Sequence, residues 1–260
     1  MEHMGATLYA DRSMFLENNA TTENRMARGS LIAHETAHMW FGDYVTMQWF
    51  DDVWTKEVFA NFFAAMIVRE QFPQIDHRLN FIRSNVPGAY GEDRTAGSTA
   101  IRQQLPNLSD AGLLYSQIIY SKSPVVMEML FTKLGPEKFR DGIREYLADH
   151  RYGNATWDDL IAVLDSRCDE DLAAWSRIWV DEKGMPTIDM TRHENRLRIM
   201  QSDPFGRRLA WNQPLQLLAF GDGNATDTLQ CLLDGPETEL VLPAGTCCVL
   251  PNADGRSYGY

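Results

Sequence analysis

The sequence contains no run of about 18 apolar residues, so no segment of it predicts a membrane-spanning helix. It also shows no internal repeat and no low-complexity segment. Basic residues are few: 24 Lys and Arg stand against 36 Asp and Glu, and the formal net charge of −12 argues against nucleic acid as the main partner. What remains is a chain of 260 residues, 44% apolar and 23% charged, which is typical of a globular protein with one large domain or two smaller ones.

Cysteine is scarce as well. The four cysteines are Cys168, Cys231, Cys247 and Cys248. None belongs to a Cys-x-x-Cys pair, so a thiolate zinc site is not predicted. We expect all four to be small buried or half-buried hydrophobic residues.

A signal peptide is not recognisable either. The beginning of the chain, MEHMGATLYADRS, lacks the basic start and the continuous apolar core of such a peptide. This slightly favours the cytoplasm. The localisation stays open, because a signal or anchor could precede this chain.

Helical signals dominate up to about residue 185. We expect Thr22 to cap a helix that runs to about Phe41 and ends at Gly42. A second helix is predicted over roughly 52–72. The residues expected on its buried face are Phe59, Phe62, Phe63, Met66 and Ile67.

Four further signals predict where later helices begin and end. Ser123 is expected to cap a helix that ends at Gly135, and Pro136 is expected to open the next one. The segment TWDD at 156–159 has the pattern of a capping box, with Asp in place of the usual Glu. Together with the first two helices, these signals predict a mostly helical domain over residues 1–185.

After Pro186 the apolar pattern shortens toward a period of two. Four short strands are predicted, in NRLRIMQ, PLQLLAF, DTLQCLL and TELVLP, with turn signals between them. Such a series is typical of a small β-sandwich, here over residues 186–260. The predicted fold class is therefore α+β.

The segment HETAHMWFGDYVTMQWFDDVWTKE, from His34 to Glu57, predicts a metal site. Residues four apart project from one face of a helix, so His34 and His38 can offer two imidazole nitrogens to one ion. Catalytic zinc usually takes three protein ligands and a water molecule. Glu57 is placed to be the third ligand, because the segment after Gly42 lets the next helix fold back against the first. We predict one Zn²⁺ per chain, held by these three residues.

The alternative is an amphipathic helix that carries two surface histidines. Leu31 and Phe41 lie on the same stripe as the histidines and should face inward, which disfavours this alternative. Two buried imidazoles and two carboxylates in a dry site would also be costly without a cation.

Glu35 indicates what such a site would catalyse. It leaves the helix about 100° around from His34, so it can border the open side of the metal without being forced into ligation. A carboxylate there can take a proton from a metal-activated water molecule and pass it to a leaving amine. The predicted reaction is metal-assisted amide hydrolysis with Glu35 as the general base.

Several segments share longer patterns with a known family. HETAHMWFGDYVT matches H-E-x-x-H-x-W-F-G-x-x-V-T, and WFDDVWTKEVFANFFA is similar to W-W-x-D-x-W-L-x-E-G-F-A. YSKSPVVMEML is similar to Y-x-K-G-A-x-V-x-x-M-L, and MEHMGA to the end of G-x-M-E-N. Over essentially its whole length the chain resembles the aminopeptidase N family of zinc metallopeptidases, the gluzincin aminopeptidases. The resemblance implies a thermolysin-like catalytic domain and the release of N-terminal residues from peptides.

Two further site residues are implied by the resemblance. Tyr120 matches the tyrosine that donates a hydrogen bond to the tetrahedral oxyanion, and Glu2 matches the glutamate that binds the free α-amine of the substrate. Taken alone, Tyr120 would be interpreted as a packing aromatic and Glu2 as a solvated terminus. The expected partners are therefore peptides with a free N-terminus.

The chain also departs from the family. Val58 replaces the Gly after the ligand glutamate, Ser123-Pro124 replace Gly-Ala, and His3 replaces Asn. The first part of the family's catalytic domain is missing, so we expect an open surface through which the chain self-associates. Two other functions stay open, a zinc endopeptidase without an amine anchor and a catalytically weak metal-binding fragment.

Overall fold

The computed structural model describes residues 2–221 and 226–260. The chain divides into two compact units, Met1–Ala89 with Ile101–Ala173, and Tyr90–Ala100 with Ala174–Tyr260. Helices and antiparallel sheets are both present, which confirms the α+β class. The predicted domain boundary between residues 185 and 186 stays a prediction. Among the described residues no helix has the length and apolar character needed to cross a membrane.

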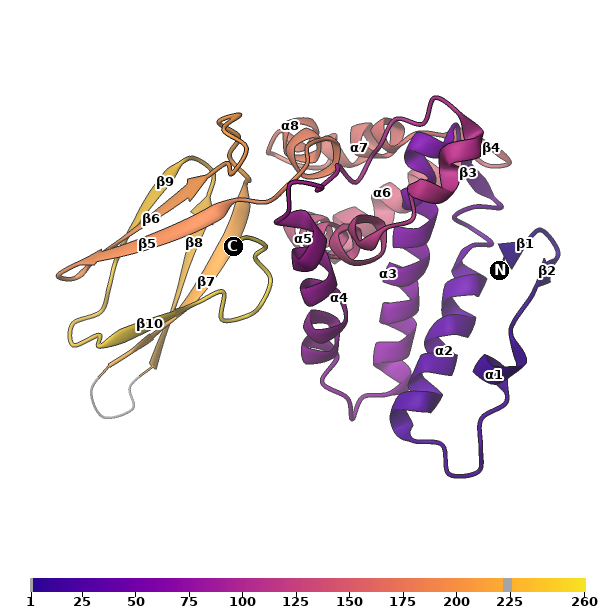
Figure 1. Cartoon of the computed structure of the whole chain (residues 1–260), viewed down its shortest axis with the longest axis horizontal. Helices are drawn as coiled ribbons and strands as arrows, with labels where there is room; N and C mark the ends of the chain where they lie inside the picture. Colours follow the sequence, from indigo (N-terminus) through magenta and orange to yellow (C-terminus); the bar gives the residue numbers. More distant parts are fainter. Residues whose placement is uncertain (1, 222–225) are drawn as a thin grey trace. The chain divides into compact units, whose positions relative to one another are not determined.

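The first unit is mostly helical, and its long helices α2 and α3 lie side by side (Figure 1). Its helices are α1 (Asp11–Met14), α2 (Thr22–Ala37), α3 (Val53–Gln71), α5 (Ser123–Leu134), α6 (Pro136–Asp149) and α7 (Trp157–Asp165). Helices α4 (His77–Asp93) and α8 (Leu172–Ser176) each begin in this unit and end in the other. Strands β1 (Glu2–His3) and β2 (Ala6–Thr7) form an antiparallel hairpin, and β3 (Val45–Met47) pairs in parallel with β4 (Gly153–Ala155).

Helix α2 begins and ends earlier than its sequence predicts. Its cap is Thr21, whose hydroxyl accepts the Asn24 N–H at 3.1 Å while the Asn24 side chain accepts the Thr21 N–H at 3.0 Å. The prediction of Thr22 is wrong by one residue, because an asparagine completes this capping box in place of Glu or Gln. The helix ends at Ala37, and the chain then turns through Gly42, whose φ of +135° is unfavourable for other residues.

Helix α3 agrees with its predicted range but not with its whole predicted buried face. Phe59 and Phe62 are buried, whereas Met66 and Ile67 are 41% and 48% exposed, so the prediction is wrong for these two. The helical period of apolar residues could not distinguish buried from exposed positions, because apolar residues occur on every side of this helix. Met66 and Ile67 line an apolar groove of about 480 Å³, together with Phe63 and residues of α2, α5 and α6.

The later helices test these four predicted signals. Gly135, with φ +77°, ends α5 and Pro136 begins α6, as predicted. Thr156 and Asp159 form the predicted capping box at the start of α7. Ser123 is not a cap: its hydroxyl donates to the carbonyl of Ile119, because a π-helical segment, Ile118–Lys122, already leads into α5.

The second unit contains two three-stranded antiparallel sheets. Their orders are β5-β6-β9 and β10-β7-β8. The strands are β5 (Thr187–His193), β6 (Arg196–Ser202), β7 (Gln213–Phe220), β8 (Thr226–Leu233), β9 (Glu237–Val241) and β10 (Cys248–Pro251). Residues of both sheets share one apolar cluster, with a buried centre of Leu197, Ile199, Leu215, Leu217, Leu233 and Leu242. Four of these strands match the predicted ones; β5 was missed because its last residues are polar and exposed, and β10 because it is short.

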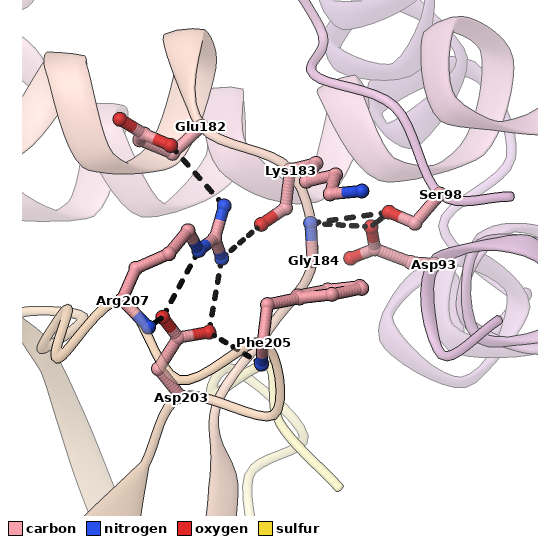
Figure 2. A network of polar contacts seen from close by, with 8 residues as sticks. All are labelled: Asp93, Ser98, Glu182, Lys183, Gly184, Asp203, Phe205 and Arg207. Carbon is pink, nitrogen blue, oxygen red and sulfur yellow. Dashed lines mark hydrogen bonds and ion pairs between the residues drawn. The ribbon is translucent and has the colours of Figure 1, made fainter. Parts of the chain in front are cut away.

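Two polar clusters hold the irregular parts of the second unit (Figure 2). In one, the Gly184 N–H lies 3.2 Å from a carboxylate oxygen of Asp93 and 3.1 Å from the hydroxyl oxygen of Ser98. In the other, the Arg207 guanidinium donates two hydrogen bonds to the Asp203 carboxylate, both at 3.0 Å, and a third to the Lys183 carbonyl at 2.7 Å. The first cluster therefore ties the segment Tyr90–Ala100 to the residues that follow α8.

We expect Arg207→Ala to lower the free energy of unfolding by about 2–3 kcal/mol, because it removes several hydrogen bonds that involve charged groups and leaves the Asp203 carboxylate without its guanidinium. The matched control is Arg256→Ala: Arg256 is exposed, its ion pair with the half-buried Asp254 spans 3.9 Å, and this pair should contribute less than about 1 kcal/mol. Urea unfolding followed by circular dichroism measures both. Equal losses in the two variants would contradict a special role for the Arg207 cluster.

Candidate metal centre

The end of α2 and the first turns of α3 bring three possible metal ligands together. The Nε2 atoms of His34 and His38 lie 3.1 Å apart. The Glu57 Oε2 atom lies 3.7 Å from the first of these nitrogens and 4.0 Å from the second. One ligand atom of each residue falls within 4.8 Å of the others, and this is the one such group of three or more His, Cys, Asp or Glu found among the described residues.

Hydrogen bonds on the other ring nitrogens fix the tautomers of both histidines. The His34 Nδ1 lies 2.9 Å from the Asn61 side-chain oxygen, and the His38 Nδ1 lies 3.0 Å from the Phe41 carbonyl oxygen. Both oxygens are acceptors, so each Nδ1 carries the proton and each neutral ring presents a lone pair at Nε2.

This arrangement fits a bound cation. Two nitrogen lone pairs that face each other at 3.1 Å repel, and a cation between them and the Glu57 carboxylate removes the repulsion. Two imidazoles and one carboxylate are also a ligand set of catalytic zinc. The residues present therefore suit Zn²⁺.

Burial and neighbouring charges favour side-chain states that can bind a metal. His38 is 1% exposed and Glu57 8%. Burial lowers the pKa of His34, and the neighbouring His38 lowers it further, which favours the neutral ring that a metal needs. The other Glu57 oxygen, Oε1, lies 3.6 Å from the Lys56 ammonium. The ammonium thereby helps to direct Oε2 toward the imidazoles.

Glu35 is buried on α2, between the two histidines in sequence. Burial raises the pKa of Tyr9, and the charge of the Glu35 carboxylate raises it further, so the two side chains interact electrostatically. Tyr9 follows the β1–β2 hairpin, and no motif in the sequence singles it out. The structure thus adds a phenol to the surroundings of Glu35.

Comparisons with known proteins identify the family to which the chain belongs. Residues 1–179 match the family model described as the Peptidase family M1 domain. The chain belongs to peptidase family M1.

Three curated relatives of this M1 chain come from archaea and bacteria. It is 31% identical over 205 residues to the Tricorn protease-interacting factor F2 of Thermoplasma acidophilum, a match that covers 79% of this chain and 26% of the relative. It is 32% identical over 222 residues to Aminopeptidase N of Lactococcus lactis subsp. cremoris, which covers 83% of this chain and 26% of the relative. It is 28% identical over 221 residues to Probable aminopeptidase 2 of Sulfurisphaera tokodaii, a match that covers 84% of this chain and 28% of the relative. The chain therefore spans about a quarter of the length of these relatives.

Two residues that the family resemblance implied lie apart from the three ligands in sequence. Tyr120 belongs to the π-helical segment Ile118–Lys122, is 42% exposed and stacks on Tyr115 with 6.1 Å between ring centroids. It lines a cavity of about 360 Å³ that Asn61 also lines. Glu2 pairs with Thr7 in the hairpin, but its side chain lies outside the described residues. The roles of Tyr120 and Glu2 stay predictions.

The hydrogen-bond partners of the histidines were missed from the sequence. Asn61 stands four residues after Glu57 on α3, so one face of this helix supplies both the carboxylate and the partner of His34. That spacing was visible in the sequence and could have predicted the residue. The Phe41 carbonyl carried no signal, because a backbone acceptor is the same in every residue.

We expect Asn61→Ala to weaken Zn²⁺ binding by about 10–100-fold, because His34 loses the acceptor that fixes its tautomer and ring orientation. Competition with a chromophoric chelator measures the dissociation constant. Asn85→Ala is the matched control, since Asn85 lines the same cavity but bonds to the Phe81 carbonyl. An unchanged affinity in Asn61→Ala would show that this hydrogen bond does not support the metal centre.

Proposed function

We propose that this chain is the zinc-binding part of an aminopeptidase that releases N-terminal residues from peptides. The observation that carries the proposal is the convergence of two Nε2 lone pairs and one carboxylate oxygen beside a buried glutamate. Membership of peptidase family M1 and the names of the relatives support it. We further propose that the first unit is a thermolysin-like catalytic domain and that the two sheets of the second unit form a β-sandwich.

A zinc ion bound by His34, His38 and Glu57 would lower the pKa of a water molecule and polarise the scissile carbonyl. Glu35 accepts a proton from the attacking water and passes it to the leaving amine. Glu35 is buried on α2 and directly follows the ligand His34, so it lies beside the site that it serves.

Two other side chains complete the proposed reaction. The Tyr120 hydroxyl donates a hydrogen bond to the oxygen on which negative charge develops. The Glu2 carboxylate pairs with the α-ammonium of the substrate, and this pairing selects peptides with a free N-terminus. A zinc endopeptidase would lack that anchor, so the effect of Glu2 on substrate choice separates the two activities. Self-association of the chain stays a prediction.

We expect Glu35→Gln to keep zinc and to lose hydrolysis by at least about 10²-fold, because an amide of the same shape cannot accept the proton. His38→Ala, by contrast, should lose zinc as well as activity. Metal analysis after dialysis and hydrolysis of aminoacyl fluorogenic amides, measured on this chain and on a longer chain of its relatives' length, test both. Near-normal turnover by Glu35→Gln would exclude Glu35 as the base, and equal zinc in His38→Ala and wild type would overturn the metal centre. Zinc binding without activity in either chain would favour the metal-binding fragment instead.

We expect Tyr120→Phe to lower kcat by about 10²–10³-fold with little change in KM, which is the effect of removing one hydrogen-bond donor to an oxyanion. Tyr115→Phe is the matched control, because Tyr115 stacks on Tyr120 and should not donate to the substrate. A change confined to KM in Tyr120→Phe would place the residue in ground-state binding.

A further inference from the structure

Cys247 and Cys248 form an exposed pair of thiols in the second unit. The expectation that all four cysteines are buried or half-buried is wrong for these two. Their Sγ atoms lie 3.8 Å apart. Successive residues of a strand normally point to opposite faces of a sheet. Cys247 precedes β10 and Cys248 begins it, so the change from turn to strand lets both thiols point to one side.

The backbone that presents this pair is held in place. The Cys247 N–H donates to the Phe220 carbonyl of β7 at 2.7 Å, and Cys248 pairs with Phe220 in the sheet. In the turn before them, the Thr246 hydroxyl donates to the Pro243 carbonyl at 2.7 Å. The pair is therefore carried by a paired strand end rather than by a free loop.

The separation of the sulfurs suits a tetrahedral cation. With metal–sulfur bonds of about 2.3 Å, two sulfurs 3.8 Å apart subtend an angle of about 111° at the ion. That value is close to the tetrahedral angle that Zn²⁺ prefers. Two thiolates of one chain can thus bind the same ion, and binding would replace the hydrogen bond that the Cys247 thiol donates to the Phe220 carbonyl at 3.0 Å.

A disulfide between the two cysteines is less favourable. Neighbouring Cα atoms are about 3.8 Å apart across a trans peptide bond. Disulfides usually join Cα atoms about 4.4–6.8 Å apart, so closing this ring would be strained. The strain favours the dithiol form, in which the pair can bind a cation.

We propose that Cys247 and Cys248 form a second metal site, a two-thiolate chelate for a thiophilic divalent cation such as Zn²⁺ or Cd²⁺. Two metal–sulfur bonds form and two thiol protons pass to the solvent. Water molecules, or the same pair of a second copy, complete the coordination. The site does not rest on the proposed peptidase function, because both ligands lie in the second unit and the candidate metal centre lies in the first.

The test is a titration of the reduced, zinc-loaded chain with Cd²⁺, followed by the ultraviolet charge-transfer band of cadmium thiolates. We expect the band to saturate at one ion per chain, or at one per two chains with dimers in sedimentation; either result supports two thiolate ligands from each chain. In Cys247→Ser and in Cys248→Ser the dissociation constant should rise about 10²-fold or more, because the second sulfur no longer binds as part of the same chelate.

Two control variants make the result specific. Cys231→Ser changes a half-buried thiol of the same unit and Cys168→Ser one of the other unit, and both should leave the titration unchanged. The proposal is overturned if wild type shows no band, or if the band survives in Cys247→Ser and Cys248→Ser with unchanged affinity. Exchange of Cd²⁺ for zinc at His34, His38 and Glu57 produces no thiolate band, so failure here is distinguishable from failure of the proposed function.

Discussion

The approach of two imidazole nitrogens to 3.1 Å is the constraint on which the candidate metal centre depends. Two neutral rings at this separation are oriented by an acceptor for each Nδ1–H, and a cation between the two Nε2 lone pairs would remove their repulsion. The early end of α2 supplies one acceptor, because the turn that leads to Gly42 brings the Phe41 carbonyl back to His38. Packing of α3 against α2 supplies the other through Asn61. The helix end and the helix pair are therefore parts of the same site.

The position of Glu57 depends in turn on how α3 begins. Asp52, the residue before that helix, is 3% exposed. Burial raises its pKa, and the Arg102 guanidinium, 2.9 Å away, opposes that rise. The Asp52 carboxylate also accepts the Trp157 N–H at 3.3 Å, at the start of α7. One buried carboxylate thus ties the start of α3 to two distant segments, and Glu57 follows five residues later.

Prediction from the sequence succeeded where a local rule decides the structure. The i, i+4 spacing of His34 and His38, the positive φ of Gly135 and the hydrogen bonds of Thr156 are all set within a few residues. Prediction failed where packing between residues that are distant in the sequence decides the structure. Ile67 is as apolar as its buried neighbours on α3, and Ser123 is a good cap residue, but the groove beside α3 and the π-helical segment before α5 come from tertiary structure.

Support for function differs between the two units, because the family match covers chiefly the first unit. The family match ends at residue 179, shortly after the main segment of the second unit begins at Ala174. Membership of M1 is therefore chiefly a statement about the first unit, where the histidines lie. The second unit is held by its own leucine-rich cluster and by the hydrogen bonds of Arg207. Because Cys247 is hydrogen-bonded to β7 and Cys248 belongs to the same sheet, the chemistry of the pair depends on that sheet and not on the metal centre.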